Sequence, residues 1–376
     1  MDRALRFLKR EPMLTVSALA ALVSMFITPP SAALLKAIDW RTLGTLLMML
    51  CVLEGFKQEN VLEPLVKLSL RARTMTGLSL FYIFGVFFSS MFVTNDVSLM
   101  IFVPLTIFTF RGGGKEKYIL PVITMENIAA IRGSLLTPFG SPQNLFLYSR
   151  FGISAGRFML HMLPLCAGSA VLLVVFVLVL YRKGLHEEIE FDHSKFGEKA
   201  GEKRYFYLAL FGMVIFTIVS RTGFWWAAVA IVVGAILAAD RKLFLKVDYV
   251  LIFTFLFFFV FSSSIAANSG IARFLDSAVS RHEYWWAIGL SQVISNVPAS
   301  IVLYPFADSH AGLIYGADTA GLCSLIGSLA SVINYRIYVR EYPDKGREFI
   351  KVFTLISWAF FLIVVIPAYL LTAWEM

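Results

Sequence analysis

Three consecutive polar residues, Thr94, Asn95 and Asp96, lie in the middle of a long and otherwise apolar run, residues 75–110. At membrane depth such residues are costly, because lipid offers no hydrogen-bond partners to polar groups. They are tolerated only where they face protein, water or a ligand. Basic residues flank the run at both ends. A re-entrant hairpin with the polar residues at its tip therefore keeps both basic ends on one side of the membrane.

A second stretch, within residues 284–306, repeats this pattern about half a chain later. Its Ser295 and Asn296 align with Thr94 and Asn95 of the first stretch. Two similar polar interruptions of apolar runs indicate a duplicated transporter architecture with two re-entrant hairpins.

Each hairpin is followed by an apolar run that contains helix breakers. In residues 118–148 the breakers are Gly133, Pro138, Gly140 and Pro142. In residues 312–335 they are Gly316, Gly321 and Gly327. Interrupted helices occur at membrane depth only where their free backbone groups line a cavity or meet protein. We expect two broken helices, one in each half of the chain.

The composition fixes the class of protein. The chain has 376 residues, of which 58% are hydrophobic and only 15% are charged, and its mean hydropathy is +0.75. A soluble domain of this length does not have such a composition, and a β-barrel would show short alternating segments instead. We predict an all-α polytopic protein of the lipid bilayer. The net charge of +8 comes from basic residues in short loops, which favours topology signalling over nucleic-acid binding.

The expected organisation is two repeats, residues 1–181 and 205–376, joined by a polar cytoplasmic linker at residues 182–204. Besides the hairpins at 75–110 and 284–306, nine membrane spans are predicted. They are residues 13–28, 41–56, 118–148, 158–181, 205–220, 223–239, 247–267, 312–335 and 350–373.

Loop charges orient this arrangement. With the N-terminus in the cytoplasm and the C-terminus outside, most of the 33 Lys and Arg residues lie in cytoplasmic loops. The first hairpin then enters from the cytoplasm and the second from outside, as inverted repeats require. The first repeat lacks an opening helix that the second repeat has.

Broken helices and hairpin tips carry a specific chemistry. The exposed N–H groups of a helix N-terminus attract anions, and free carbonyl groups at a C-terminus attract cations. Four such points at mid-membrane can build one anion site flanked by cation sites. The amides of Asn95 and Asn296 suit the tips because they donate and accept hydrogen bonds. An alternative interpretation is that the polar tip residues merely cap the helices that follow them.

Three charged residues lie within the apolar runs. Asp96 at the first tip can carry a proton, bind a cation or pair with Arg132. Arg132 can meet an anionic substrate, or form a salt bridge with Glu126 or Asp96. Glu126 lies six residues before Arg132, so the two do not form a tight helical i,i+4 pair. We expect these three residues to be involved in charge coupling.

These motifs resemble those of the ion transporter superfamily, which includes citrate and other dicarboxylate carriers, arsenite permeases and related sodium/proton antiporters. The sequence TND at 94–96 and SN at 295–296 are similar to its paired hairpin-tip motifs. The sequence LLTPFGSPQNLFLYS at 135–149 is similar to its broken-helix signature. The resemblance covers essentially the whole chain. It implies an elevator-type secondary carrier, often a homodimer.

The resemblance also implies site residues. The first substrate and cation half-site would comprise Thr94, Asn95, Thr137, Gly140, Ser141 and Asn144. The second half-site would comprise Ser295, Asn296, Ser324, Gly327 and Ser328. Three positions depart from the family pattern. Asp96 and Val297 replace the third residue of each tip, and Leu325 stands where the first repeat has Pro138.

We therefore predict a secondary active transporter of a small anion, a carboxylate or an oxyanion. Its coupling ion is a proton or a sodium ion, and no other cofactor is expected. The alternatives within transport are an arsenite or metalloid efflux permease and a sodium/proton antiporter. An intramembrane enzyme is disfavoured because the sequence shows no catalytic Ser/His pattern and no His-Glu-x-x-His motif.

Overall fold

The computed structural model describes residues 12–29, 36, 38–61, 72–184, 187–188, 201–220 and 223–374. Within these ranges the chain is helical, and its only β-type pairing is an isolated bridge between Thr74 and Glu188. The first half contains α2 (Pro12–Ile27), α4 (Trp40–Gln58), α6 (Met75–Val93), α7 (Asn95–Gly112), α8 (Ile119–Ser134), α9 (Pro142–Phe151) and α10 (Ala155–Leu180). The second half contains α11 (Arg204–Ser220), α12 (Trp225–Ala239), α13 (Tyr249–Ala267), α14 (Ser269–Val279), α15 (Glu283–Ile294), α16 (Asn296–Leu303), α17 (His310–Ala320), α18 (Leu329–Glu341) and α19 (Gly346–Leu371).

Several of these helices are suited to lipid. Four described segments are long and apolar enough to cross a bilayer, namely Met75–Val93, Ala155–Leu180, Tyr249–Ala267 and Pro343–Leu371. Three shorter apolar helices are Leu14–Phe26, Arg204–Ser220 and Trp225–Ala239. This confirms the all-α polytopic membrane class. The predicted linker, residues 182–204, lies mostly outside the described residues.

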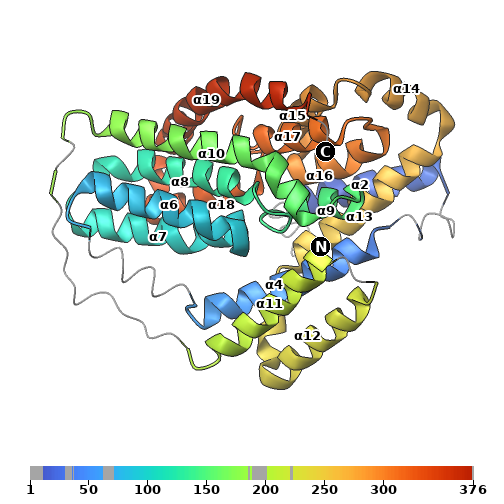
Figure 1. The fold of residues 1–376 in the computed structure, drawn as a ribbon, viewed down its shortest axis with the longest axis horizontal. Helices are drawn as coiled ribbons and strands as arrows, with labels where there is room; N and C mark the ends of the chain where they lie inside the picture. Colours follow the sequence, from blue (N-terminus) through green and yellow to red (C-terminus); the bar gives the residue numbers. More distant parts are fainter. Residues whose placement is uncertain are drawn as a thin grey trace.

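Both polar-tipped stretches fold into helical hairpins. The chain turns at Thr94 between α6 and α7, which pack against each other and against α8 (Figure 1). It turns again at Ser295 between α15 and α16, which pack against α17. The hairpins differ in size. At a rise of about 1.5 Å per residue, α6 is roughly 28 Å long and α15 roughly 18 Å.

The two broken helices join the halves of the molecule. After the first break, α9 leaves α8 and packs against α16 and α17 of the second half. After the second break, α18 leaves α17 and packs against α7 and α8 of the first half (Figure 1). Each hairpin is thus covered by the far segment of the other half's broken helix. The breaks of both halves come together in the middle of this unit.

Two glycines expected to break helices lie inside them. Gly133 is in the last turn of α8 and Gly316 is in the middle of α17. A Cβ atom at Gly133 would lie 1.9 Å from the carbonyl oxygen of Phe87, and one at Gly316 would lie 2.5 Å from that of Tyr284. These glycines therefore allow close contact between each broken helix and its hairpin. The breaks themselves follow Ser134 and Ala320.

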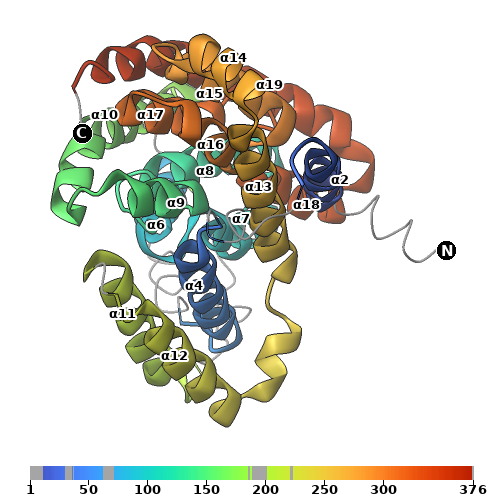
Figure 2. The ribbon, with the colours of Figure 1, turned by 90° about the vertical axis from the view of Figure 1, so that its right-hand side faces the viewer.

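The remaining helices surround this central unit. The helices α11 and α12 pack against α4, and α2 packs against α13. Figure 2 shows α4, α11 and α12 grouped on one side of the molecule, away from α15, α17 and α19. The long helices α10 and α19 have 26 residues each, contain an internal proline (Pro164 and Pro367) and both pack against α8. Side-chain caps of Asp39 and Asp248 begin α4 and α13.

Candidate functional site

The two hairpin tips share an unusual backbone conformation. Thr94 has φ 71° and ψ 156°, and Ser295 has φ 70° and ψ 158°. Residues other than glycine rarely adopt this region, and each instance costs about 1–3 kcal/mol. Such strain persists only where the surrounding structure imposes it. Its occurrence at both tips, with the same angles, shows that both turns are built in the same way.

Each tip is tied to the break of the helix that follows it. The backbone N–H of Asn95 donates to the carbonyl of Gly140 at 3.3 Å, and the N–H of Asn296 donates to the carbonyl of Gly327 at 3.2 Å. In the first half the Thr137 hydroxyl also donates to the carbonyl of Met91. The structure therefore brings each predicted tip motif into contact with its predicted broken-helix motif.

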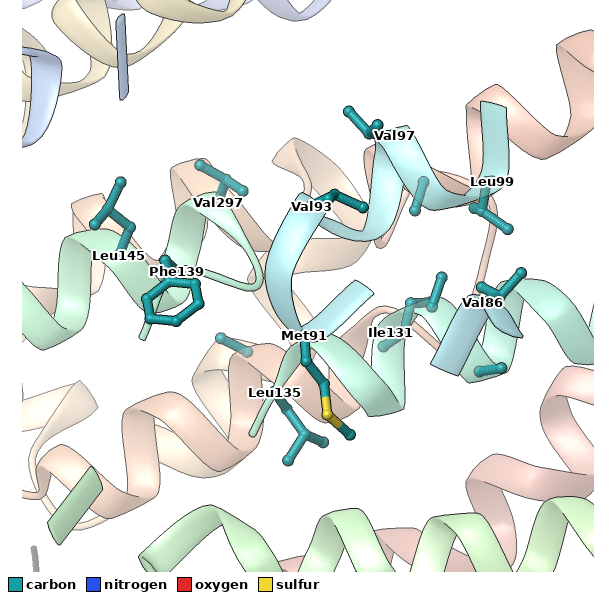
Figure 3. Close-up of a cluster of buried hydrophobic side chains, with 14 of the residues drawn as sticks. Val86, Met91, Val93, Val97, Leu99, Ile131, Leu135, Phe139, Leu145 and Val297 are labelled. Atoms are coloured by element: carbon teal, nitrogen blue, oxygen red, sulfur yellow. The ribbon is translucent and has the colours of Figure 1, made fainter. Parts of the chain in front are cut away.

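Apolar side chains surround the first tip. Figure 3 shows them converging from both arms of the hairpin, from α8, from the first break and from α16. The labelled residues are Val86, Met91, Val93, Val97, Leu99, Ile131, Leu135, Phe139, Leu145 and Val297. In such surroundings the effective dielectric constant is low, so a charge or an open hydrogen-bonding group nearby acts more strongly than it would in water.

The capping interpretation of the tips fails for Thr94 and Ser295, whereas the side-chain oxygen of Asn95 accepts from the Asp96 N–H in the first turn of α7 at 2.9 Å. Ser141 begins α9, and its hydroxyl accepts from the Asn144 N–H at 3.4 Å. The side chains of Thr94 and Ser295, by contrast, make no capping hydrogen bond to α7 or α16. The Ser295 hydroxyl has no partner among the described residues, although it is buried.

The other predicted residues of the second half-site lie at the second break. The Ser324 hydroxyl accepts from the Gly327 N–H at 3.2 Å and donates to Gln292 at 2.7 Å. Ser328 is buried and precedes α18 without capping it through its side chain. Asn296 donates through its amide to the carbonyl of Ala317 at 3.4 Å. Leu325, which replaces a proline, does not prevent the break.

Asp96 faces a different part of the protein from Arg132. It is half-buried in the first turn of α7, and one of its carboxylate oxygens, Oδ1, has no hydrogen-bond partner in the described chain. The charges that act on it are Asp248 and Lys57, at the ends of α13 and α4. The predicted pair of Asp96 with Arg132 does not form.

Glu126 is likewise separate from Arg132. It is fully buried on α8, where its Oε1 accepts from the Thr106 hydroxyl of α7. Its other oxygen, Oε2, has no partner among the described residues. Because the two residues are six positions apart, they point in different directions from α8, and the expected salt bridge between Glu126 and Arg132 is absent.

Arg132 is the most unusual residue of the site. Its side chain is 0% exposed, and none of its three guanidinium nitrogens has a hydrogen-bond partner in the described part of the chain. The charged group that acts on it most strongly is Asp318 on α17. A buried arginine without hydrogen bonds is costly, because its lost hydration is not replaced. Its environment is suited to accept an anion.

Asp318 was not identified from the sequence, although it lies near the centre of the site. It is 1% exposed and accepts a hydrogen bond from the Gln143 amide at 3.1 Å. The Asn144 amide nitrogen, in the orientation its surroundings favour, lies 3.1 Å from Asp318 Oδ1 and 3.3 Å from Oδ2. Gln143 and Asn144 belong to the first turn of α9, whose positive end stabilises a carboxylate. The sequence signal that could have identified Asp318 is an acidic residue within an apolar run.

Together these residues form a buried polar centre between the two breaks. Arg132 comes from the end of α8, Asp318 from the end of α17, and Gln143 and Asn144 from the start of α9. The hydrogen bonds to Asp318 from α9 compensate part of its charge. Because none of these hydrogen bonds comes from Arg132, all five N–H donors of its guanidinium remain free. They can hold a carboxylate or an oxyanion in a bidentate manner.

Comparisons with known proteins agree with this architecture. Residues 5–312 match the family described as citrate transporter. The chain is 30% identical to the inner membrane protein YbiR of Escherichia coli over 88% of this chain and 90% of that protein. It is 28% identical to the uncharacterized transporter MJ0456 of Methanocaldococcus jannaschii, over 80% and 81% of the two chains. It is also 21% identical to a 46 kDa membrane protein of Mycobacterium leprae, over 80% and 79%. The chain thus belongs to the citrate transporter family of membrane transporters.

Proposed function

We propose that this protein is a secondary active transporter whose substrate is a small anion bound by Arg132. The observation that carries the proposal is the fully buried guanidinium with three unpartnered nitrogens, placed where the two broken helices meet. In a membrane interior a buried charged group without hydrogen-bond partners is a functional-site candidate. A carboxylate or an oxyanion would provide the missing hydrogen bonds through charge-assisted, bidentate contacts.

The same observation separates the candidate substrates. A neutral metalloid hydroxide cannot make charge-assisted bidentate hydrogen bonds with the guanidinium, so the arsenite alternative receives less support than an anion. An intramembrane enzyme receives less support than a carrier, since the family description names a transporter. The family description, citrate transporter, agrees with a carboxylate.

The polar tips are proposed to complete the site. Thr94 and Ser295 hold strained backbone conformations, and the Ser295 hydroxyl is buried without a partner. Together with the carbonyl groups of the breaks, such hydroxyls can coordinate the substrate, a proton or a sodium ion. The matching geometry of the tips supports an inverted repeat, with the first hairpin entering from the cytoplasm and the second from outside.

An elevator movement is proposed as the transport mechanism. At one end of α4, Asp39 accepts from Ser149 at 3.0 Å and pairs with Arg150 at 3.1 Å. At the other end of α4, Lys57 acts on Asp96 at the hairpin tip. With α4 running inwards from its start, the influence of Lys57 on Asp96 favours a first tip nearer the cytoplasmic end of α4, which supports an inward-facing state. The Asp39 contacts must then break for the site to move outwards.

The proposal is tested by anion binding to purified protein. Citrate, malate, succinate, sulfate and phosphate are titrated while thermal unfolding in detergent is followed. We expect at least one of these anions to raise the melting temperature of the wild type and of Arg157→Gln, a control at an exposed arginine. Arg132→Lys should weaken this effect, because an ammonium group cannot bind in a bidentate manner. Arg132→Met should abolish it. Anion binding that persists in Arg132→Met overturns the assignment.

The mechanism has a separate test in proteoliposomes. The double variant Asp39→Cys/Arg150→Cys is treated with a mercury ion. The ion links the two thiols and fixes the start of α4 to α9. We expect uptake of the bound anion to stop on bridging and to recover when a thiol is added. Full uptake with the bridge in place would exclude a movement between these two helices.

A further inference from the structure

A second buried polar cluster lies where α7, α8 and α18 pack together, apart from the Arg132 site. It contains Thr106 of α7, Glu126 and Asn127 of α8, and Ser331 and Asn334 of α18. All five side chains are 0% exposed. Such a cluster in a unit that is otherwise apolar requires an explanation, because each buried polar group without a partner costs about 1–3 kcal/mol.

Each amide nitrogen of the cluster and the Thr106 hydroxyl donate a hydrogen bond, whereas three acceptors have no partner among the described residues. The Asn127 amide nitrogen donates to Ser331 Oγ at 3.0 Å, and that of Asn334 donates to the carbonyl of Ile123 at 2.7 Å. Thr106 donates to one oxygen of Glu126. Three acceptors have no partner in the described residues, namely Glu126 Oε2, Asn127 Oδ1 and Asn334 Oδ1.

Two of the three free oxygens belong to one turn of α8, and the third lies beside that turn on α18. Glu126 and Asn127 are adjacent, and the carbonyl of Ile123 points along the helix towards the N–H of Asn127. Asn334, which is hydrogen-bonded to that carbonyl, therefore lies beside the turn that carries Glu126 and Asn127. Asn127 also donates a hydrogen bond to Ser331, which lies one turn before Asn334 on α18. This second bond holds α18 in the same position relative to α8.

Three acceptors without a donor identify the missing partner. A water molecule has two hydrogens and cannot satisfy three acceptors. A proton on Glu126 would create one donor and leave at least one amide oxygen free. A cation satisfies all three, since carboxylate and amide oxygens are the ligands that hard cations prefer. One carboxylate balances one positive charge, whereas a divalent ion would leave an excess charge in the membrane.

We propose that Glu126, Asn127 and Asn334 form a sodium site, in which Glu126 Oε2 and the two amide oxygens coordinate the ion. The site joins α7 and α8 of the first half to α18, the far segment of the second broken helix. Sodium binding would therefore stabilise the packing on which the second break depends. The proposal deepens the proposed function by naming the coupling ion, and it rests on that function only for the link to transport.

Sodium binding is measured on purified protein without substrate. Thermal unfolding is followed as NaCl replaces choline chloride at constant ionic strength, with KCl and LiCl as comparisons. We expect wild-type protein to be stabilised by NaCl with a saturable midpoint, as linkage requires for an ion that binds only the folded state. Glu126→Gln should raise that midpoint by about tenfold or more, because the charged ligand is lost. Glu126→Gln introduces no unpaired charge, so its folding should be retained.

Two further variants make the test specific. Asn334→Ser shortens the third ligand and should also weaken sodium binding. Asp344→Asn alters an exposed carboxylate outside the cluster and should leave the sodium midpoint unchanged. The proposal is overturned by an equal effect of choline and sodium, by an unchanged midpoint in Glu126→Gln, or by stabilisation that follows acidic pH and not sodium. Failure of anion binding to Arg132, by contrast, would overturn the proposed function and leave this measurement unaffected.

Discussion

Removing the charge of Asp318 should destabilise the protein more than removing the charge of Arg132. Asp318→Asn leaves a fully buried guanidinium with neither a hydrogen bond nor a compensating charge. Breaking a buried charge pair from one side costs about 3–5 kcal/mol. Arg132→Met also leaves one charge behind, but the carboxylate of Asp318 keeps its hydrogen bonds from Gln143 and Asn144. We expect Arg132→Met to lie within about 2 kcal/mol of the wild type, because three unpartnered nitrogens disappear with it.

The double variant Arg132→Met/Asp318→Asn distinguishes this reasoning from a general effect of substitution. Both charges are then absent, and replacement of a buried ion pair by neutral side chains is often neutral or stabilising by about 1–4 kcal/mol. We expect the order of stability, from lowest to highest, to be Asp318→Asn, Arg132→Met, double variant. The double variant should equal or exceed the wild type, although it should bind no anion.

The assay is thermal unfolding of the four proteins in one detergent, in a buffer with chloride as the sole anion. A double-mutant cycle gives the interaction between the two positions, which should exceed the roughly 0.5 kcal/mol scatter of independent sites. Two results would refute the argument. One is an Asp318→Asn variant as stable as the wild type, and the other is a double variant whose loss equals the sum of the single losses.

Three further perturbations test separate parts of the structure. Gly133→Ala should destabilise the protein by about 3 kcal/mol or more in a melting assay, because its Cβ would lie 1.9 Å from a carbonyl oxygen of α6. The control Gly168→Ala on α10 should leave the melting temperature unchanged, because its Cβ meets no atom within 4 Å. Thr94→Gly should raise the free energy of unfolding by about 1 kcal/mol, since glycine adopts the φ of 71° at this position without strain. It should also weaken ion or substrate binding if the Thr94 hydroxyl is a ligand. An unchanged stability would contradict the claim that the backbone is strained at Thr94. The pKa of Glu187 lies below its ordinary value because Lys115 and a tyrosine hydroxyl bind its carboxylate, so its stabilising contribution is present near neutral pH and lost as the pH falls below about 4.5. Glu187→Gln should therefore lower the melting temperature modestly at pH 7, and its difference from the wild type should shrink progressively as the pH falls below about 4.5.

The helices of this protein could be predicted closely because their signal is local. Runs of apolar residues, with basic loops between them, indicated the spans, and the turns at Thr94 and Ser295 could be expected from polar residues that lipid does not tolerate. The glycines were less informative. A glycine can end a helix or admit a neighbouring backbone, and the sequence does not show which of these occurs at Gly133 and Gly316.

The candidate site could be predicted only in part, because it depends on which helices of one half pack against the other half. Asn95, Gly140, Asn296 and Gly327 were found through their motifs. The surroundings of Asp318 could not be found in this way, since its hydrogen-bond donors come from α9, more than 170 residues earlier in the chain. The pairing of Arg132 was misjudged for the same reason, because the acids nearest in sequence are not those nearest in space.

The tips of the two halves, and their hydrogen bonds to the breaks, have the same backbone geometry, but the two halves carry different charges. When Gly140 is aligned with Gly327, Arg132 aligns with Thr319, and Asp318 aligns with Ile131. The base thus comes from one broken helix and the acid from the other, at neighbouring levels. A duplicated scaffold needs only matching backbones at its tips and breaks, which explains why Leu325 can replace a proline there. The charges instead are distributed unequally, as a site requires when it must bind one anion in one orientation. If Arg132 and Asp318 were only a structural pair, the neutral double variant Arg132→Met/Asp318→Asn would still bind the anion, whereas our assignment predicts a folded protein that binds none.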